Sequence, residues 1–237
     1  MNISVCMATF NGEKYIRQQL DSILCQLSIS DELIISDDGS TDNTIKIISS
    51  YIENDERIRL YFNEKRKGVV GNFENALYYA SGDYILLSDQ DDVWLPNKVE
   101  TIVNYLQKYD CVVSDAILID AYGNIISNSF LKKNNKKGVL HNFIKNGYLG
   151  CCIALNKRML KYVLPFPANI PMHDVWIGLI SELFGKTLFC KEKLIYYRRH
   201  GLNYSSTSEE SNNTFFFKLR YRLILLINLI KRLFESK

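Results

Sequence analysis

Two groups of carboxylates, each directly after a short apolar run, are the residues of this sequence best suited to chemistry. The first group lies in residues 37–42 (Asp-Asp-Gly-Ser-Thr-Asp) and the second in residues 89–92 (Asp-Gln-Asp-Asp). Clustered carboxylates repel one another, and a cation or a hydrogen-bond donor among them relieves that repulsion. The two groups therefore indicate a metal ion and a polar ligand that carries phosphate.

Asp37 and Asp38 end an apolar run and are followed by Gly39 and a predicted helix. A carboxylate at this place can accept the N3–H of a uracil or thymine ring, or bind ribose hydroxyls. The structural alternative is that Asp38 or Asp42 only caps the helix. A pair of aspartates directly before a helix favours the ligand-binding interpretation over the capping alternative.

Asp89, Asp91 and Asp92 follow the apolar residues 84–87. Their oxygens suit hard cations such as Mg²⁺ or Mn²⁺, which bind one or two carboxylates together with substrate phosphates. A cation there would neutralise the charge that builds on a diphosphate leaving group. The alternative, a polar turn before Pro96, leaves three crowded acids unexplained, so we predict a metal site.

The elements that must position these carboxylates alternate between strand and helix over the first half of the chain. The spacing of apolar residues predicts strands at 3–7, 33–36, 58–62 and 84–87, and helices at 13–26, 42–52, 69–80 and 96–109. This order predicts an α/β fold, a mostly parallel twisted sheet with helices on both faces. In such sheets ligands bind outside the carboxyl ends of the strands, so both acidic groups should meet at one edge.

The pattern changes in the second half. Strands are predicted at 112–119, 125–126 and 150–155, followed by a hairpin-like pair at 188–190 and 195–197, with helices at 156–163 and 173–184. Residues 204–213 are rich in Ser, Glu and Asn and predict a linker. Five basic residues interrupt the apolar segment 215–234, which predicts an amphipathic helix.

The composition is that of an ordinary globular protein. A chain of 237 residues suffices for one large α/β domain, and a net charge of +3 gives no indication of nucleic-acid binding. The six cysteines lack C-x-x-C spacing, which predicts buried reduced thiols in a cytosolic protein rather than zinc ligands. We expect no signal peptide and no membrane span, since no apolar run reaches roughly 18 residues.

From about Ile3 to Ser205 the chain resembles the inverting family 2 glycosyltransferases with the GT-A (Rossmann-like) fold. The resemblance rests on residues 5–11 (Val-Cys-Met-Ala-Thr-Phe-Asn), on the segment 37–42, and on 89–94, which is similar to the D-x-D-type site of that family. Three further segments resemble a rhamnosyltransferase-like subgroup: 150–156, 172–176 (Met-His-Asp-Val-Trp), and 197–200 (Tyr-Arg-Arg-His) followed by Asn203.

The resemblance implies a nucleotide-diphosphate-sugar donor, a divalent cation (Mg²⁺ or Mn²⁺), and direct displacement with inversion at the anomeric carbon. By position, the residues that would hold the nucleotide are Thr9, Asn11, Asp37 and Asp38, and Asp89 would approach the ribose or the metal. Asp91 would be the main metal ligand. Asp174 would be the general base, which must approach the acceptor hydroxyl to about 3 Å.

The sequence surroundings of three further residues, Asn72, Arg198 and His200, indicate that they belong to the same site. Asn72, near the turn into the third predicted helix, could reach the nucleotide. His200 lies beside Arg198 and Arg199 at a strand end, where it could ligate the metal or, with the arginines, contact the diphosphate. The alternative for His200 is a structural role.

The chain departs from the family pattern in two places. Many members have Glu-Asp where this chain has His173-Asp174, so His173 either takes part in the site or packs beside it. The tail lacks the Q-x-x-R-W signature of processive synthases, which favours addition of a single sugar. For His141, which has no basic neighbours of this kind, we predict a structural role.

The basic helix at 215–234 favours a position in the interface of an anionic membrane. The alternative is a helix docked on the domain or on a dimer partner. We predict membrane association because a lipid-linked acceptor would place this chemistry at the inner leaflet.

The sequence thus predicts a GT-A domain over residues 1–205, with a nucleotide-sugar half (1–92) and an acceptor half (93–205), and a linker and membrane-associating helix over 206–237. We expect transfer of dTDP-linked rhamnose or a UDP-linked hexose to a lipid-linked glycan in bacterial surface-polysaccharide synthesis, such as O-antigen or capsule. The protein would be peripheral on the cytoplasmic face of the plasma membrane. Two alternatives remain: a haloacid-dehalogenase-type phosphatase, whose nucleophile motif residues 89–93 match in form, and an inactive nucleotide-sugar-binding membrane scaffold.

Overall fold

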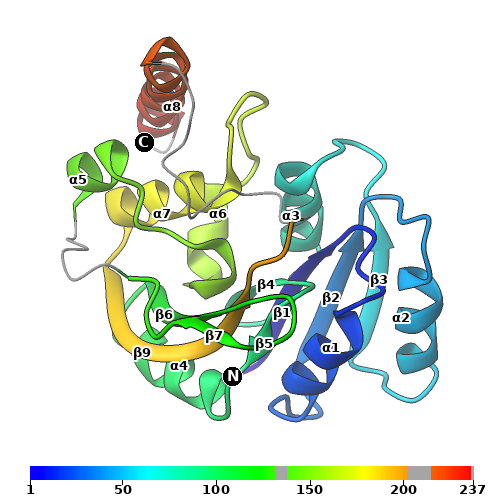
Figure 1. Ribbon diagram of the computed structural model, residues 1–237. Coiled ribbons are helices and arrows are strands. Elements are labelled where there is room, and N and C mark those ends of the chain that lie inside the picture. Colours follow the sequence, from blue (N-terminus) through cyan, green and yellow to red (C-terminus); the bar gives the residue numbers. More distant parts are fainter. Residues whose placement is uncertain (132–137, 202–214, 236–237) are drawn as a thin grey trace.

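A computed structural model describes residues 1–131, 138–201 and 215–235, and only the backbone of 215–218. One sheet has the strand order β3-β2-β1-β4-β8-β6-β9-β5, with β7 paired to β6 (Figure 1). The strands are β1 (Ile3–Thr9), β2 (Glu32–Asp37), β3 (Ile58–Phe62), β4 (Tyr84–Asp89), β5 (Val93–Trp94), β6 (Cys111–Ile119), β7 (Ile125–Ser127), β8 (Ile153–Asn156) and β9 (Thr187–Arg198). The helices are α1 (Ile16–Leu24), α2 (Thr44–Ile52), α3 (Val69–Tyr78), α4 (Lys98–Leu106), α5 (Val139–Ile144), α6 (Leu160–Val163), α7 (His173–Phe184) and α8 (Phe215–Glu235), with 3₁₀ turns at Gly150–Cys152 and Lys157–Met159.

The first four strands in chain order form the parallel part of the sheet. β1 lies between β2 and β4, and β3 pairs with β2, all in parallel. Every residue of β1 is buried, as expected for a continuous apolar strand covered on both faces. The register places Thr9 beside Asp37 and Ala8 beside Asp89. The two acidic groups therefore meet at one sheet edge, as predicted.

The other half of the sheet is mixed, so the expectation of a mostly parallel sheet holds only for its first half. β8 runs antiparallel to both β4 and β6, and β9 runs parallel to β6 and antiparallel to β5. The hairpin-like pair predicted within residues 188–197 is wrong, because Thr187–Arg198 is one strand. Its polar residues 191–193 resemble a turn in the sequence but are exposed within the strand, where the register against β6 shifts.

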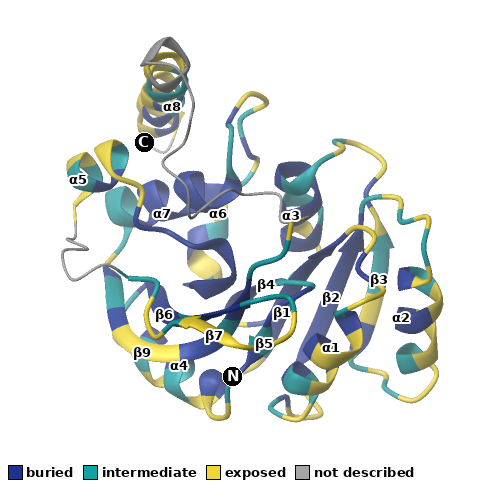
Figure 2. Ribbon diagram, viewed as in Figure 1, coloured by how far each residue is buried: buried dark blue, intermediate teal, exposed yellow. Residues whose placement is uncertain are grey.

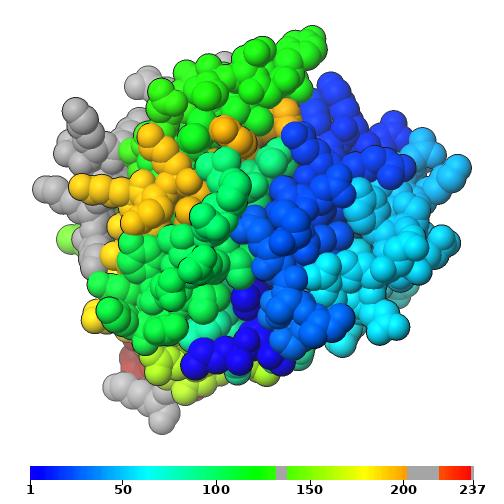
Figure 3. All heavy atoms as spheres, turned by 90° about the horizontal axis from the view of Figure 1, so that it is seen from below, coloured from blue at the N-terminus to red at the C-terminus, as the bar shows by residue number. Residues whose placement is uncertain are grey.

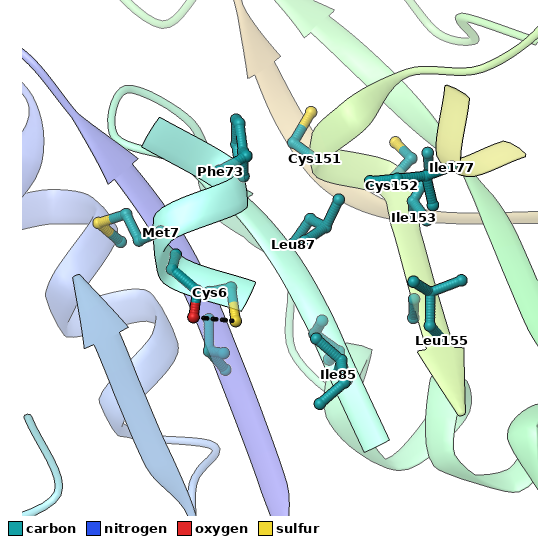
Figure 4. Close-up of a cluster of buried hydrophobic side chains, with 14 of the residues drawn as sticks. Cys6, Met7, Phe73, Ile85, Leu87, Cys151, Cys152, Ile153, Leu155 and Ile177 are labelled. Carbon is teal, nitrogen blue, oxygen red and sulfur yellow. Dashed lines mark hydrogen bonds between the residues drawn. The ribbon is translucent and has the colours of Figure 1, made fainter. Parts of the chain in front are cut away.

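The core lies between the sheet and the helices α3 and α7. Figure 4 shows Cys6, Met7 and Leu87 of the parallel strands near Phe73 of α3, with Ile177 of α7 beside the second half of the sheet. The Cys6 thiol donates to the carbonyl of Ala76 (3.7 Å). Strands β1 and β2 are buried along their whole length and β4 along most of it (Figure 2). One hydrophobic core includes residues of both predicted halves, 1–92 and 93–205. The two halves are in direct contact in the view from below (Figure 3).

The helix predicted at 215–234 is present as α8 and lies near α5, α6 and α7 (Figure 1). Leu225 and Leu229 are buried, and the buried Arg232 guanidinium donates to the carbonyls of Tyr162 (2.6 Å) and Leu164 (2.8 Å). One face of the helix is thus docked on the domain. Asn203 and the linker predicted at 204–213 lie outside the described residues. Within the described ranges, no helix combines the length and the apolar character that crossing a bilayer requires.

Candidate active site

A cavity of about 700 Å³ follows the carboxyl edge of β1 and β4 and ends at the first turn of α7. Most of the predicted site residues line it: Thr9, Asn11, Asp38, Asn72, Asp89, Asp91, His173, Asp174 and His200. Asp37 and Arg198, which were also predicted to contact the donor, are not among the lining residues. The cavity therefore brings together residues from six separate parts of the chain.

Asp37 organises the loop after β2 instead of facing the cavity. Its carboxylate is 1% exposed and accepts hydrogen bonds from the backbone N–H of Gly39 (2.9 Å) and Ser40 (2.8 Å). It also accepts from the hydroxyls of Ser40 (2.5 Å) and Thr9 (3.0 Å). With four donors already on its two oxygens, Asp37 acts on a ligand by shaping the loop.

Asp38 points the other way and lines the cavity. One of its oxygens accepts from the side chain of Asn63 (2.8 Å) and the other from the backbone N–H of Gly68 (2.7 Å). Asp42 instead accepts from the N–H (2.9 Å) and hydroxyl (2.5 Å) of Thr44, the first residue of α2, whose N-cap residue is Asn43. Asp38 thus lines the cavity, whereas Asp42 is bonded to the start of the next helix.

Asn72 and Asn11 lie on either side of the end of β1. The Asn72 amide donates to the carbonyl of Thr9 (3.0 Å), which fixes its orientation and leaves its buried Oδ1 without a partner among the described residues. Asn11, at a positive φ of 48°, accepts from the N–H of Thr41 (2.8 Å). The Oδ1 of Asn72 is thus a buried acceptor without a partner among the described residues, on a side chain that lines the cavity.

Asp91 and His200 form a close pair on the cavity wall. The Oδ2 atom of Asp91 lies 2.6 Å from Nε2 of His200, and the ring of Tyr15 lies 5.0 Å from the imidazole. A carboxylate and an imidazole nitrogen that converge in this way, with Asp89 on the same wall, are suitable ligands for Mn²⁺ or Mg²⁺. The residues therefore fit the expected cation.

Asp89 and Asp92 lie next to Cys151. Ligand atoms of these three residues are within 4.8 Å of one another. Burial and the neighbouring Asp91 raise the pKa of both carboxyls. The buried Lys98 ammonium, 3.0 Å from the Cys151 carbonyl, supplies a compensating charge that the sequence analysis missed. A thiol is a poor ligand for a hard cation, so this inner cluster is a less suitable metal site than Asp91 and His200.

Arg198 fastens the end of β9 to the loop that carries these acids. Its backbone N–H donates to Asp92 (3.0 Å), its Nε to the carbonyl of Asp91 (2.9 Å) and its Nη2 to Gln18 (2.7 Å). The side chain is 3% exposed. Arg198 therefore positions the acidic loop, and its contact with the donor stays a prediction.

Asp174 lies at the far end of the cavity, in the first turn of α7. Burial raises the pKa of its carboxyl to about 6, and the N–H of Val175 donates to it (2.7 Å). The helix N-terminus favours a negative charge at this place. Asp174 is therefore a carboxylate at neutral pH and a stronger base than an exposed aspartate.

Several lining residues were not predicted, among them Tyr15, Gln90, Gly150 and Met172. Gln90 joins the two loops of the site, because its side chain donates to the carbonyl of Phe10 and accepts from the N–H of the same residue (2.9 Å each). The position of Gln90 within the Asp-x-Asp segment could have indicated that it belongs to the site. Tyr15 falls within the helix predicted at 13–26, and no signal in the sequence separates it from the other residues of that helix. His141 does not line the cavity, in agreement with its predicted structural role.

Comparison with known proteins identifies the family. The model of Glycosyl transferase family 2 matches residues 4–164, more than half of the chain. The UDP-Glc:alpha-D-GlcNAc-diphosphoundecaprenol beta-1,3-glucosyltransferase WfgD of Escherichia coli is 30% identical over 183 residues, 76% of this chain and 70% of that protein. The putative teichuronic acid biosynthesis glycosyltransferase TuaG of Bacillus subtilis is 34% identical over 185 residues, 77% of this chain and 73% of that protein. Neither is named a rhamnosyltransferase, so the predicted subgroup is not supported.

Solved structures agree in fold. TarS 1-349 of S. aureus in complex with UDP-GlcNAc has a TM-score of 0.72 at 20% identity and covers 96% of this chain and 67% of its own. The mannosyltransferase PcManGT from Pyrobaculum calidifontis, in complex with GDP-Man and Mn²⁺, has a TM-score of 0.62 at 17% identity, over 82% of this chain and 56% of its own. The family match favours a glycosyltransferase over the phosphatase alternative. This chain belongs to glycosyl transferase family 2 and has the GT-A fold.

Proposed function

We propose that this protein transfers one hexose from a UDP-hexose to a glycan acceptor linked to a lipid diphosphate, with inversion at the anomeric carbon. The observation that carries the proposal is the single cavity that joins the loops after β1 and β2 to the buried carboxylate of Asp174. The names of the relatives favour hexose over rhamnose and a lipid-linked acceptor, because WfgD is named for UDP-Glc and a diphosphoundecaprenol substrate.

In the proposed reaction, Asp174 takes the proton of an acceptor hydroxyl as the hydroxyl oxygen forms a bond to the anomeric carbon. The bond between that carbon and the diphosphate oxygen breaks, and UDP leaves with the electron pair. Attack from the side opposite the diphosphate inverts the configuration. Asp174 suits this role because its pKa of about 6 leaves it ionised, yet basic, near neutral pH.

The remaining cavity residues would hold the nucleotide and the cation. Asp38 and the unsatisfied Oδ1 of Asn72 are acceptors for N–H and O–H groups of the nucleotide. Asp91 and His200, with Asp89, would bind Mg²⁺ or Mn²⁺. When bound, the cation would neutralise charge on the departing diphosphate.

The exposed face of α8 supports binding to an anionic membrane. Seven apolar residues form one stripe on its outer side, each at least 40% exposed: Leu219, Leu223, Leu226, Ile227, Ile230, Leu233 and Phe234. The cations Arg220 and Lys231 are also exposed, and Glu235 is the single acidic residue of the helix. We infer that α8 lies on the inner face of the plasma membrane, beside a domain that acts on lipid-linked acceptors.

Calorimetry and a transfer assay test the proposal together. The protein should bind UDP-glucose in the presence of Mn²⁺ and release UDP when a synthetic GlcNAc-diphospho-lipid is added. Asp174→Asn should bind UDP-glucose normally and lose transfer by about 10²–10⁴-fold, whereas Asp83→Asn, an exposed residue before β4, should behave like the parent.

Two results would count against the proposal. Transfer by Asp174→Asn near the parental rate would remove Asp174 as the base. Binding of UDP-glucose without transfer to any acceptor would favour the inactive scaffold.

A further inference from the structure

His173 is a buried side chain on the cavity wall whose polar atoms are unused. Its imidazole is 3% exposed and stacks on the ring of Phe73, with 4.0 Å between ring centroids and an interplanar angle of 22°. Among the described residues, neither Nδ1 nor Nε2 has a hydrogen-bond partner. An imidazole carries at least one N–H donor, and a buried donor without a partner destabilises the fold. Such a group calls for an explanation.

Packing alone does not supply that explanation. A phenyl ring at position 173 would stack on Phe73 equally well and would leave no polar atom unsatisfied. The neighbouring residue is Gly150, where an added Cβ would lie 2.6 Å from Nε2 of His173. Any side chain at position 150 would therefore collide with this nitrogen, and both residues line the cavity.

The chemistry of the ring indicates what it would bind. Burial lowers the pKa of His173 to about 3, so the imidazole is neutral at physiological pH, with one nitrogen that donates and one that accepts. A phosphate would favour a cation at this place. A sugar hydroxyl, which both donates and accepts, matches a neutral imidazole.

We propose that His173 recognises a hydroxyl of the donor sugar and so determines which nucleotide sugar the enzyme accepts. This inference rests on the proposed function. In an inverting displacement the donor sugar lies between the base and the diphosphate, so a residue adjacent to Asp174 on the buried wall faces that sugar. The acceptor approaches from solvent, on the side of the base.

The test uses two substitutions that differ in the hydrogen bonds they keep. His173→Phe preserves a ring on Phe73 and removes both nitrogens, and His173→Gln keeps one donor and one acceptor. The matched control is His141→Phe, which changes a partly exposed histidine outside the cavity. Affinities for UDP and for UDP-glucose are measured by calorimetry with Mn²⁺ on the full chain.

We expect His173→Phe to bind UDP like the parent and UDP-glucose about tenfold or more weakly, a loss of about 1.4 kcal/mol or more. His173→Gln should recover part of that loss. A series of UDP-deoxyglucoses then identifies the hydroxyl. The parent should discriminate against one of these analogues, and His173→Phe should bind that analogue and UDP-glucose with equal affinity.

Three outcomes would overturn the inference. Equal losses for UDP and UDP-glucose would mean that His173 only supports the fold. Unchanged donor affinity with a raised KM for the acceptor would assign His173 to the acceptor sugar. Unchanged behaviour in every assay would mean that the ring has no role in recognition. A parent protein that binds no UDP-hexose would instead contradict the proposed function itself.

Discussion

The guanidinium of Arg232 lies 5.3 Å from the centre of the Trp176 ring, so the C-terminal helix is fixed to the same helix, α7, whose first turn carries Asp174. Trp176 is fully buried, and Arg232 also donates to three backbone carbonyls beside it. Burial and the charge of Asp174 raise the pKa of the phenol of Tyr221, a second residue of α8. Helix α8 is therefore packed against the helix that carries Asp174.

The two faces of α8 should respond differently to substitution. Ile227→Glu places a charge in the exposed stripe, so it should weaken binding to phosphatidylglycerol vesicles and leave the melting temperature unchanged. Leu225→Ala empties a buried position and should lower the stability of the fold by about 2–5 kcal/mol. Vesicle sedimentation and thermal unfolding measure the two effects.

Ile29→Glu is the control for the membrane experiment, because Ile29 is 89% exposed in a different part of the chain. It should bind vesicles like the parent. If Ile227→Glu also binds vesicles like the parent but shifts the oligomeric state in light scattering, the stripe is a dimer contact. Deletion of α8 is a poor test, because it would also uncover Trp176.

The Asp91–His200 pair should control binding of the cation. Asp91→Asn and His200→Gln should each weaken Mn²⁺ binding in the presence of UDP by about tenfold or more. Because the two side chains are only 2.6 Å apart, their effects should not add in the double variant. Mn²⁺ titration followed by electron paramagnetic resonance measures this, with Asp83→Asn as the control. Unaltered Mn²⁺ affinity in Asp91→Asn would place the ion at the inner Asp89–Asp92 cluster.

The acidic strand ends were predictable because continuous apolar runs and parallel order place their carboxylates at one edge. What the sequence did not reveal is which atoms already have partners. Asp37 and Asp38 are adjacent and chemically identical, yet one is used by its own loop and the other faces the cavity. Arg198 was assigned to the diphosphate for its charge, but its contacts with Asp92 and Gln18 arise from tertiary packing.

Activity should depend on pH through Asp174. The carboxylate form is the reactive one, so kcat/KM should be constant above about pH 6 and fall as pH decreases through the pKa. Asp89, Tyr148 and Tyr221 carry the ionisable groups whose charges interact with Asp174. A pH–rate profile with saturating Mn²⁺ measures this limb. A profile that stays flat down to pH 5 would contradict the raised pKa.

Stability provides a second measure of the same carboxyl that does not depend on turnover. Its pKa is about 6 in the fold and 3.8 ordinarily, so the unfolded state loses its proton more easily. The ionised group therefore destabilises the fold above pH 6, by roughly 2–3 kcal/mol, and this cost disappears below about pH 4, where both states are protonated. Asp174→Asn should be inactive yet more stable than the parent at pH 7.5, with the difference vanishing at pH 4. If denaturant unfolding gives the same stability difference between Asp174→Asn and the parent at both pH values, the stabilisation comes from packing of the amide. The raised pKa of Asp174, on which its assignment as the general base rests, would then be contradicted.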